Sequence, residues 1–385
     1  MVGGGAVIFT VKPLLFAKGV PTPIAGEDET HGRRRVSIRC TSDQICNRHR
    51  PMPLRLSVLD QSPIAEGSTG AEALRNSVDL AQFAERAGYR RYWVAEHHAT
   101  PMLACASPEV LIAAISSATS RIRVGSGGVM LPHYSPLKVA ETFSMLSGLY
   151  GDRIDLAVGR APGSDPLTAF ALQRDRRQAA PDDFPEQLSE LLAYEWNRMP
   201  AGHRFARMAA LPGGPMRPVV WLLGSSPQSA VWAAELGLPY AFADFINPAG
   251  ADIAAYYRQH YTPSPVNAAP YLIAAIWVIC AETDQAAWRL AASSRMAFTL
   301  FLQGTLIPVP PVETGLAFLA EHPESAEALG RRRRWIVGSP ATVRAGVEAL
   351  AAEYRADEVM IVTITYDHAA RRRSYELAAE ALGSR

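Results

Sequence analysis

Short apolar runs alternate with helical patterns along most of this chain, and this alternation constrains the fold more than any other feature. The runs are almost continuously apolar, which is typical of parallel strands buried on both faces. Eight strands are predicted at Leu54–Asp60, Arg91–Glu96, Arg121–Leu131, Ile154–Gly159, Val219–Gly224, Tyr240–Phe245, Leu272–Ala281 and Glu358–Thr365. Eight strands with helices between them favour an α/β fold of the (β/α)8 TIM barrel type, with a doubly wound sheet as the alternative.

Serine-proline pairs mark the starts of several predicted helices. Serine is a favoured N-cap residue, and proline suits the first helical position because no hydrogen-bond donor is needed there. Helices are predicted at Ala71–Ala87, Pro108–Thr119, Leu137–Leu149, Pro185–Trp196, Pro227–Leu236 and Ala341–Tyr354. Two long insertions, Gly163–Arg217 and Ala297–Trp335, are expected to lie over the carboxyl ends of the strands.

Composition gives no sign of a nucleic-acid or membrane partner. The chain has 385 residues and a net charge of +1, which does not suggest a basic, nucleic-acid-binding surface. Its longest apolar run, Leu272–Cys280, is strand length and well short of the roughly 18 residues that cross a bilayer. No cysteines form a paired motif, and Cys105 and Cys280 lie in apolar surroundings. We therefore expect reduced core thiols and a cytoplasmic protein.

Residues 1–51 differ from the rest of the chain. The first 50 hold eight Lys and Arg against four Asp and Glu, and they show no sustained hydrophobic period. The apolar stretch Val7–Phe16 has no basic segment before it and no clear cleavage site after it, which argues against a secretory signal. We expect a disordered extension at 1–51 and one barrel domain at 52–385. A further hypothesis is that Met52 is the true start.

A carboxylate and two histidines lie where the second predicted strand ends, at Glu96, His97 and His98. One interpretation is a catalytic acid or base whose neighbours fix its orientation. A second is a metal site, although adjacent residues on a strand point to opposite faces and no other ligand spacing supports a metal. A third is a structural, hydrogen-bonded pair of histidines. The position at a barrel strand end favours function.

The fourth strand ends in a cation. Arg160 follows Gly159, and a guanidinium at a strand end is suited to binding a phosphate in a fork. The alternative is a salt bridge to a loop carboxylate such as Asp165.

The fifth strand ends in a turn suited to an anion. Gly224, Ser225 and Ser226 precede a helix that carries Ser229 in its first turn. Backbone N–H groups at a helix start, together with these hydroxyls, would bind an anion. Ser226 is also expected to cap the helix, and the two roles are compatible. Gly338-Ser339-Pro340 has the same form and is a weaker candidate.

Glycines interrupt the third strand at Gly125–Gly128. Glycine inside a strand often marks a close approach of the backbone to a ligand. The stretch is not a dinucleotide fingerprint, which needs a strand-to-helix turn, and neither a P-loop nor a nucleophile elbow is present. Two runs of arginine, Arg331–Arg334 and Arg371–Arg373, are expected to be solvated surface.

Taken together, these features resemble the bacterial luciferase-like flavin monooxygenases, over about Leu54 to Leu382. The motifs that carry the resemblance occur in order, at Ala95–His98, Val124–Pro132 with Ser135-Pro136, Gly159-Arg160, Leu223–Ser226 and Val362–His368. Each motif is modest alone, but their order on eight strands is specific.

The resemblance implies a TIM barrel that oxidises a small organic substrate with O2 through a C4a-peroxyflavin. Reduced FMN would come from a partner NAD(P)H:flavin reductase, and a homodimer without a metal is expected. The resemblance makes His97 the catalytic residue, with Glu96 and His98 beside it, and it implies a non-prolyl cis peptide at Gly127-Gly128. Flavin contacts are implied for Gly127, Gly128, Arg160, Gly224, Ser225, Ser226 and Ser229.

Two positions depart from luciferase itself. Gly159 stands where luciferase has a reactive cysteine, and Ser225 stands where it has a glutamate, so light emission is not inferred. The nearest alternative is a relative that uses deazaflavin F420 for hydride transfer without oxygen. Further alternatives are a non-catalytic flavin-binding protein and a metal-dependent barrel hydrolase that uses His97 and His98.

Overall fold

The computed structural model describes residues 54–383, apart from 162, 164, 179–181, 209 and 333. The predicted extension at 1–51 and its boundary lie outside the described residues. Residues 200–207 are a short run of turns that belongs to a separate unit. The other described residues form the barrel body.

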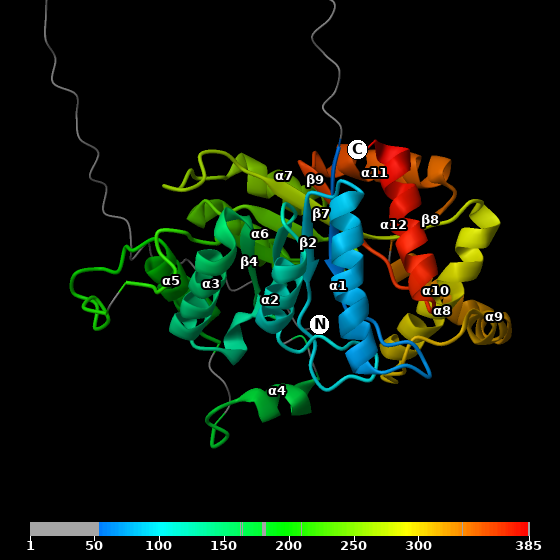
Figure 1. Ribbon diagram of the computed structural model, residues 1–385, viewed down its shortest axis with the longest axis horizontal. Helices are drawn as coiled ribbons and strands as arrows, with labels where there is room; N and C mark the ends of the chain where they lie inside the picture. The colour runs from blue at the N-terminus through cyan, green and yellow to red at the C-terminus, as the bar shows by residue number, and fades with distance from the viewer. Residues whose placement is uncertain are drawn as a thin grey trace, which may run out of the picture. The chain divides into compact units, whose positions relative to one another are not determined.

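Parallel strands build a closed barrel (Figure 1). The ring runs from β1 through β2, β3, β4, β5, β6, β7 and β9 and back to β1, because β6 pairs with β7 and β9 pairs with both β7 and β1. The barrel strands are β1 Arg55–Asp60, β2 Arg91–Val94, β3 Arg123–Met130, β4 Ile154–Gly159, β5 Val219–Gly224, β6 Tyr240–Ala243, β7 Leu272–Cys280 and β9 Glu358–Val362. The predicted TIM barrel is confirmed, and these are the eight strands that the pattern predicted.

One further strand, β8 Trp335–Gly338, was not predicted. It pairs with Trp277–Cys280 of β7, outside the ring. Its four residues follow an arginine-rich stretch and are too few to give a periodic signal. The pattern also placed the end of β2 too late, because the strand stops at Val94 and leaves Glu96 in the following loop.

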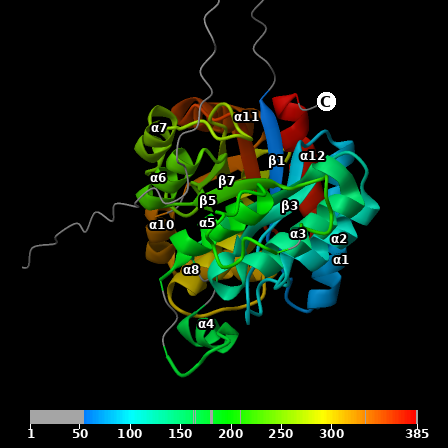
Figure 2. The same ribbon diagram turned by 90° about the vertical axis from the view of Figure 1, so that its left-hand side faces the viewer.

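Helices surround the barrel (Figures 1 and 2). Figure 2 shows β1, β5 and β7 between α6 and α7 on one side and α1 and α2 on the other. The helices are α1 Gly70–Arg86, α2 Pro108–Ala118, α3 Pro136–Tyr150, α4 Pro166–Leu172, α5 Phe184–Glu195, α6 Pro227–Leu236, α7 Ala251–Gln259, α8 Asp284–Leu302, α9 Val312–Glu321, α10 Pro323–Arg332, α11 Pro340–Tyr354 and α12 His368–Leu382. Two single 3-10 turns lie at Leu131–His133 and Gly151–Arg153.

The predicted serine-proline helix starts are confirmed in position, but the serine hydroxyls do not make the capping hydrogen bonds that were expected. Ser107, Ser135, Ser226 and Ser339 stand at the N-caps of α2, α3, α6 and α11, yet none of their hydroxyls bonds a backbone N–H of the first turn. Proline is the first helical residue in all four helices, and it removes one of the N–H groups that a helix start leaves without an intrahelical partner. The hydroxyl of Ser226 is thus not used by α6.

Two hydrophobic layers hold the body together. The outer layer lies between the strands and the helices, and it includes Leu80, Ile112 and Phe143. The inner layer fills the barrel, where Trp93 and Trp221 meet edge to face with ring centroids 5.2 Å apart. Cys105 and Cys280 are free and buried, as predicted.

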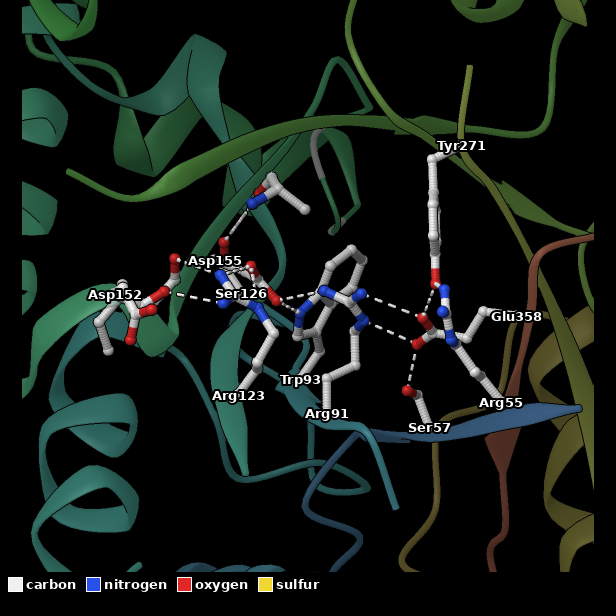
Figure 3. Close-up of polar contacts among 12 residues, drawn as sticks. Arg55, Ser57, Arg91, Trp93, Arg123, Ser126, Asp152, Asp155, Tyr271 and Glu358 are labelled. Atoms are coloured by element: carbon white, nitrogen blue, oxygen red, sulfur yellow. Dashed lines mark hydrogen bonds and ion pairs between the residues drawn. The ribbon is translucent and has the colours of Figure 1, made fainter. Parts of the chain in front are cut away.

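A buried ion network joins the amino ends of the strands (Figure 3). Arg91, at the start of β2, donates to Asp155 of β4 at 2.7 Å and to both oxygens of Glu358 of β9 at 2.7 and 3.0 Å. Burial alone would raise the pKa of Asp155, but Arg91 and Arg123 outweigh it and hold that pKa below its ordinary value. Ser57 of β1 also donates to Glu358. The network links the strands at the end opposite to the predicted site, where barrels are stabilised.

Arg371 is not solvated surface, contrary to the prediction. It lies buried in the first turn of α12, and its Nη2 donates to Asp60 Oδ1 at 2.6 Å. Tyr92 donates to the other oxygen of Asp60 at 2.5 Å. The helical period turns Arg371 toward the barrel, whereas Arg372 and Arg373 of the same run keep partly exposed side chains.

Both predicted insertions reach the carboxyl ends of the strands. The first contains α4 and α5, and Phe184 at the start of α5 lines a cavity at that end. The second contains the end of α8 together with α9 and α10. Its Val309 is fully buried and exchanges backbone hydrogen bonds of 2.8 Å with Ile64 and Glu66, in the loop after β1.

Candidate active site

A cavity of about 580 Å³ lies at the carboxyl ends of the strands, within the ~300–1,000 Å³ that is usual for ligand sites. Eight of the ten predicted site residues line it, and His98 and Gly128 do not. Every barrel strand contributes to its wall, through Leu59, Trp93, Gly127, Gly159, Leu222, Ala241, Ala275 and Met360. The fold therefore brings together segments that are far apart in the sequence.

Glu96, His97 and His98 separate into two groups. His97 lines the cavity, whereas His98 is bonded to Glu96 through its Nε2, 2.7 Å from Oε1. Because β2 ends at Val94, the three residues follow a loop and not the alternation of a strand. Glu96 and His98 are thus bonded to each other, while Glu96 and His97 both line the cavity.

The Glu96 carboxyl group is fully buried and has three partners. Besides His98, Tyr134 donates its hydroxyl to Oε1 at 3.0 Å, and the Met130 backbone N–H donates to Oε2 at 3.0 Å. These bonds join the loop after β2 to the end of β3 and to the 3-10 turn that follows it. Tyr134 was not predicted as a site residue, because its hydroxyl meets Glu96 only through the fold.

His97 is a neutral imidazole at physiological pH. Burial, together with the smaller effect of the neighbouring His98, lowers its pKa to about 4. Its Nδ1 is enclosed and has no hydrogen-bond partner among the described residues. A buried polar atom without a partner is uncommon in proteins, and it often marks a place where a ligand or a water binds. His97 thus offers one donor and one acceptor without a positive charge.

Arg160 is the cation of the cavity. Its guanidinium is about half exposed and is paired with Asp182, with Nη2–Oδ2 and Nε–Oδ1 distances of 2.6 and 3.2 Å. The partner suggested from the sequence, Asp165, instead caps α4 by accepting from the Leu167 and Thr168 backbone N–H groups. A salt bridge is therefore present, but its acid lies further along the insertion than the pattern suggested.

The start of α6 forms the wall next to Arg160. Gly224, Ser225, Ser226 and Ser229 all line the cavity. The Ser229 hydroxyl donates to the Ser226 carbonyl at 2.7 Å and lies 2.8 Å from the Tyr240 hydroxyl. These two contacts fix the position of the turn. A Cβ at Gly224 would lie 2.4 Å from Ser229 Oγ, and only glycine fits there.

The peptide bond between Gly127 and Gly128 is cis, at the position that the resemblance implied. Gly127 lines the cavity, and a Cβ there would lie 2.5 Å from the Leu59 side chain. A Cβ at Gly128 would meet Leu223 at 2.6 Å and the Ala157 carbonyl oxygen at 2.8 Å. These close contacts with side chains and backbone thus favour glycine at both positions.

Several cavity residues were missed from the sequence, and Gln61, Phe184 and Trp232 are three of them. Gln61 follows β1, is nearly fully buried, and has an enclosed Oε1 without a partner. Trp232 of α6 packs on Phe184 of α5 with ring centroids 5.3 Å apart, and both line the cavity. A single glutamine after a strand and two aromatic residues on helices carry no local signal. Only the barrel closure brings them to one place.

Two other kinds of site are absent from the described part of the chain. No helix there is long and apolar enough to cross a membrane. No group of three or more His, Cys, Asp or Glu side chains in the same residues is arranged to hold a metal ion. The hydrolase alternative therefore has no ligand set in that part of the structure.

A closed parallel barrel with a half-buried histidine and a cation facing one carboxyl-end cavity has the architecture of a barrel enzyme. The family model of the luciferase-like monooxygenases matches residues 54–358. The chain belongs to the luciferase-like monooxygenase family, as the sequence motifs indicated.

Curated relatives match over almost their whole length. The chain is 44% identical to the uncharacterized protein YwcH of Bacillus subtilis (strain 168), over 85% of this chain and 98% of YwcH. It is 40% identical to a luciferase-like monooxygenase of Escherichia coli (strain K12), over 85% and 96% of the two chains. It is 36% identical to an N-acetyl-S-alkylcysteine monooxygenase of Bacillus subtilis (strain 168), over 86% and 98%.

Solved structures also match most of this chain and almost the whole of their own length. Apo-MsnO8 is 41% identical, with a TM-score of 0.76 over 86% of this chain and 99% of its own. The oxygenating constituent of 3,6-diketocamphane monooxygenase from Pseudomonas putida, solved with FMN, is 20% identical with a TM-score of 0.64 over 86% and 98%. An F420-dependent secondary alcohol dehydrogenase is 14% identical, with a TM-score of 0.58 over 86% and 99%. The last two show a shared fold.

Proposed function

We propose that this protein is a flavin-dependent monooxygenase that uses reduced FMN and O2 to oxidise a small organic substrate. The observation that carries the proposal is one cavity with an arginine and a helix start at one place and a neutral, half-buried histidine at another. Family membership and the named monooxygenase relatives support the reaction class. The fold shared with a protein solved with FMN supports the choice of cofactor.

The residues around Arg160 fit a phosphate group. A guanidinium binds phosphate through a fork of N–H donors, and the amino end of a helix adds backbone donors and a favourable dipole. Arg160 and the first residues of α6 line the same wall. Asn247 donates to the Ser225 carbonyl at 2.9 Å and thereby fixes the turn. We assign the phosphate of FMN to this place, with Ser225 and Ser226 as further donors.

The remaining walls fit a flat, largely apolar ring. Trp93, Leu223 and Met130 line the cavity, and Gly127 has no side chain to occupy it. Apolar walls exclude water, which protects reactive species and strengthens the few polar contacts inside. Reduced FMN would supply the two electrons, so that one atom of O2 enters the substrate and the other leaves as water.

His97 is assigned a proton-transfer and hydrogen-bonding role at the substrate or cofactor. Its low pKa keeps the imidazole neutral, and a neutral imidazole can accept a proton at one nitrogen while the other nitrogen donates. Glu96 and His98 hold the loop that carries it. The reductase that delivers reduced FMN and the homodimer remain predictions of the family resemblance.

Anaerobic titration of the full chain with reduced FMN and, in parallel, with reduced F420 tests this function. Tryptophan fluorescence reports binding, because Trp93 and Trp232 line the cavity. The proposal predicts saturable binding of reduced FMN and consumption of O2 when air is admitted. Preference for F420 without O2 consumption would assign hydride transfer instead. Binding of neither cofactor would overturn the assignment of the cavity.

A further inference from the structure

The pairing of Arg160 with Asp182 has a consequence for ligand binding. Two guanidinium nitrogens of Arg160 meet the two carboxylate oxygens of Asp182, at 2.6 and 3.2 Å. This is the fork-to-fork arrangement in which arginine also binds phosphate, so one face of the guanidinium cannot serve both anions at once. The chain's own carboxylate therefore occupies donors that the proposed phosphate site requires.

Charges along the cavity wall make this pair distinctive. Among the described residues that line the cavity, Arg160 is the one Arg or Lys side chain, and Glu96 is the one Asp or Glu side chain. Glu96 already accepts from His98, Tyr134 and Met130. Arg160 is therefore the cationic side chain that the described cavity wall offers to an incoming anion. Asp182, which pairs with Arg160, competes with that anion for the guanidinium.

Packing of the neighbouring residue Phe184 holds Asp182 near Arg160. Phe184, two residues further along the chain, is 2% exposed and packs on Trp232 in the cavity wall. The Arg160 guanidinium carbon lies 5.8 Å from the centroid of the Trp232 ring. Docking of Phe184 thus places Asp182 beside Arg160, while the Asp182 side chain itself is 70% exposed and free to turn away.

We propose that Asp182 is a built-in competitor for the ligand phosphate and thereby lowers the preference of the cavity for phosphorylated ligands. The inference rests on the proposed function, because it takes the ligand to be a phosphate-bearing flavin. A phosphate group carries more charge than one carboxylate, so it displaces Asp182 from Arg160 on binding. A flavin without phosphate leaves the pair intact.

The test compares wild-type protein with Asp182→Asn, and the control variant is Asp175→Asn. Asp175 pairs with Arg177 in an exposed contact of the same insertion, and neither residue lines the cavity. Each protein is titrated with FMN, riboflavin and inorganic phosphate at low salt. Because exposed ion pairs are weak, Asp182→Asn is expected to bind FMN about two- to fivefold more tightly. Riboflavin binding should be unchanged, and Asp175→Asn should match wild type with all three ligands.

The outcomes separate this inference from the proposed function. If wild type and Asp182→Asn bind FMN equally well, or the variant binds it more weakly, the competition is overturned and the flavin assignment stands. If Asp182→Asn tightens the binding of riboflavin as much as that of FMN, the effect does not concern phosphate and the inference is also wrong. If phosphate binds more tightly to Asp182→Asn but neither protein binds FMN, the competition is supported and the flavin assignment fails.

Discussion

The imidazole of His98 lies 2.7 Å from the carboxyl group of Glu96, and this contact assigns different tasks to neighbouring residues of one short motif. Glu96 and His98 bond to each other, while His97 between them lines the cavity. Two residues that bond to each other thus flank His97 along three consecutive positions, and Glu96 and His97 both line the cavity. This division of tasks, the barrel that carries it and the cavity that it serves can each be tested by substitution.

Tyr134→Phe removes one of the three donors to Glu96. The buried carboxyl group then keeps His98 and the Met130 N–H, and we expect the free energy of unfolding to fall by about 1–3 kcal/mol. Tyr150→Phe is the matched control, because its hydroxyl meets Ser117 in an exposed contact. Urea unfolding of both variants checks the prediction. Equal, small effects would mean that Tyr134 does not hold Glu96.

His97 should make the protein less stable in acid. Its folded-state pKa is about 4 against an ordinary value of 6.5, so between these pH values the unfolded chain binds the proton and the folded chain does not. Stability is therefore lost as the pH falls through this window, and the part due to His97 is about 2 kcal/mol by pH 5. Unfolding of wild type and His97→Gln at pH 7 and pH 5 measures it. Parallel losses in the two proteins would contradict the low pKa.

Arg91→Met tests the ion network of Figure 3. The substitution leaves Glu358 buried without its ion-pair partner Arg91, while Asp155 keeps its ion pair with Arg123. Uncompensated buried charge costs about 3–5 kcal/mol, which we expect to lose from the free energy of unfolding. Arg344→Met breaks an exposed pair with Glu348 and should cost no more than about 0.5 kcal/mol. A cost for Arg91→Met as small as this control would show that the network does not stabilise the barrel.

The Gln61→Leu substitution should lower the affinity for reduced FMN without lowering the free energy of unfolding. The Gln61 Oε1 has no partner in the described structure, so replacing the amide with an apolar side chain should leave the free energy of unfolding unchanged or raise it by about 1 kcal/mol. If the amide contacts the ligand, affinity for reduced FMN should fall about three- to tenfold. Thermal unfolding and fluorescence titration give the two quantities. Loss of stability with full affinity would make Gln61 a structural residue.

The barrel was predictable from the sequence, because each of its strands is a short and largely apolar run that can be recognised without knowledge of its neighbours. The run Val219–Gly224 is apolar from end to end, Ile154–Gly159 is apolar except for Asp155, and the structure reproduces both boundaries. Short β8 was not predictable, since its four residues lack a period and β7 is its one strand partner in the described sheet. Arg371 was misplaced because a run of arginines gives no hint of which one a helix turns inward.

The candidate site was predictable only where residues follow strands. His97, Arg160 and the turn at Gly224 lie directly after β2, β4 and β5, so their convergence follows from the barrel itself. Tyr134 and Asp182 belong to later turns and to an insertion, and their partners are distant in sequence. Such contacts depend on the packing of loops, which no local pattern encodes.

The assignment of the cavity to a flavin phosphate is tested by the affinity of Arg160→Met for FMN and for riboflavin, measured beside wild type by fluorescence titration. The proposed phosphate site predicts that FMN binding weakens about tenfold or more, because charge-assisted hydrogen bonds to the phosphate are lost. Riboflavin, which has no phosphate, should bind both proteins equally. Unchanged FMN affinity in Arg160→Met would contradict the claim that this cavity binds a flavin phosphate through Arg160.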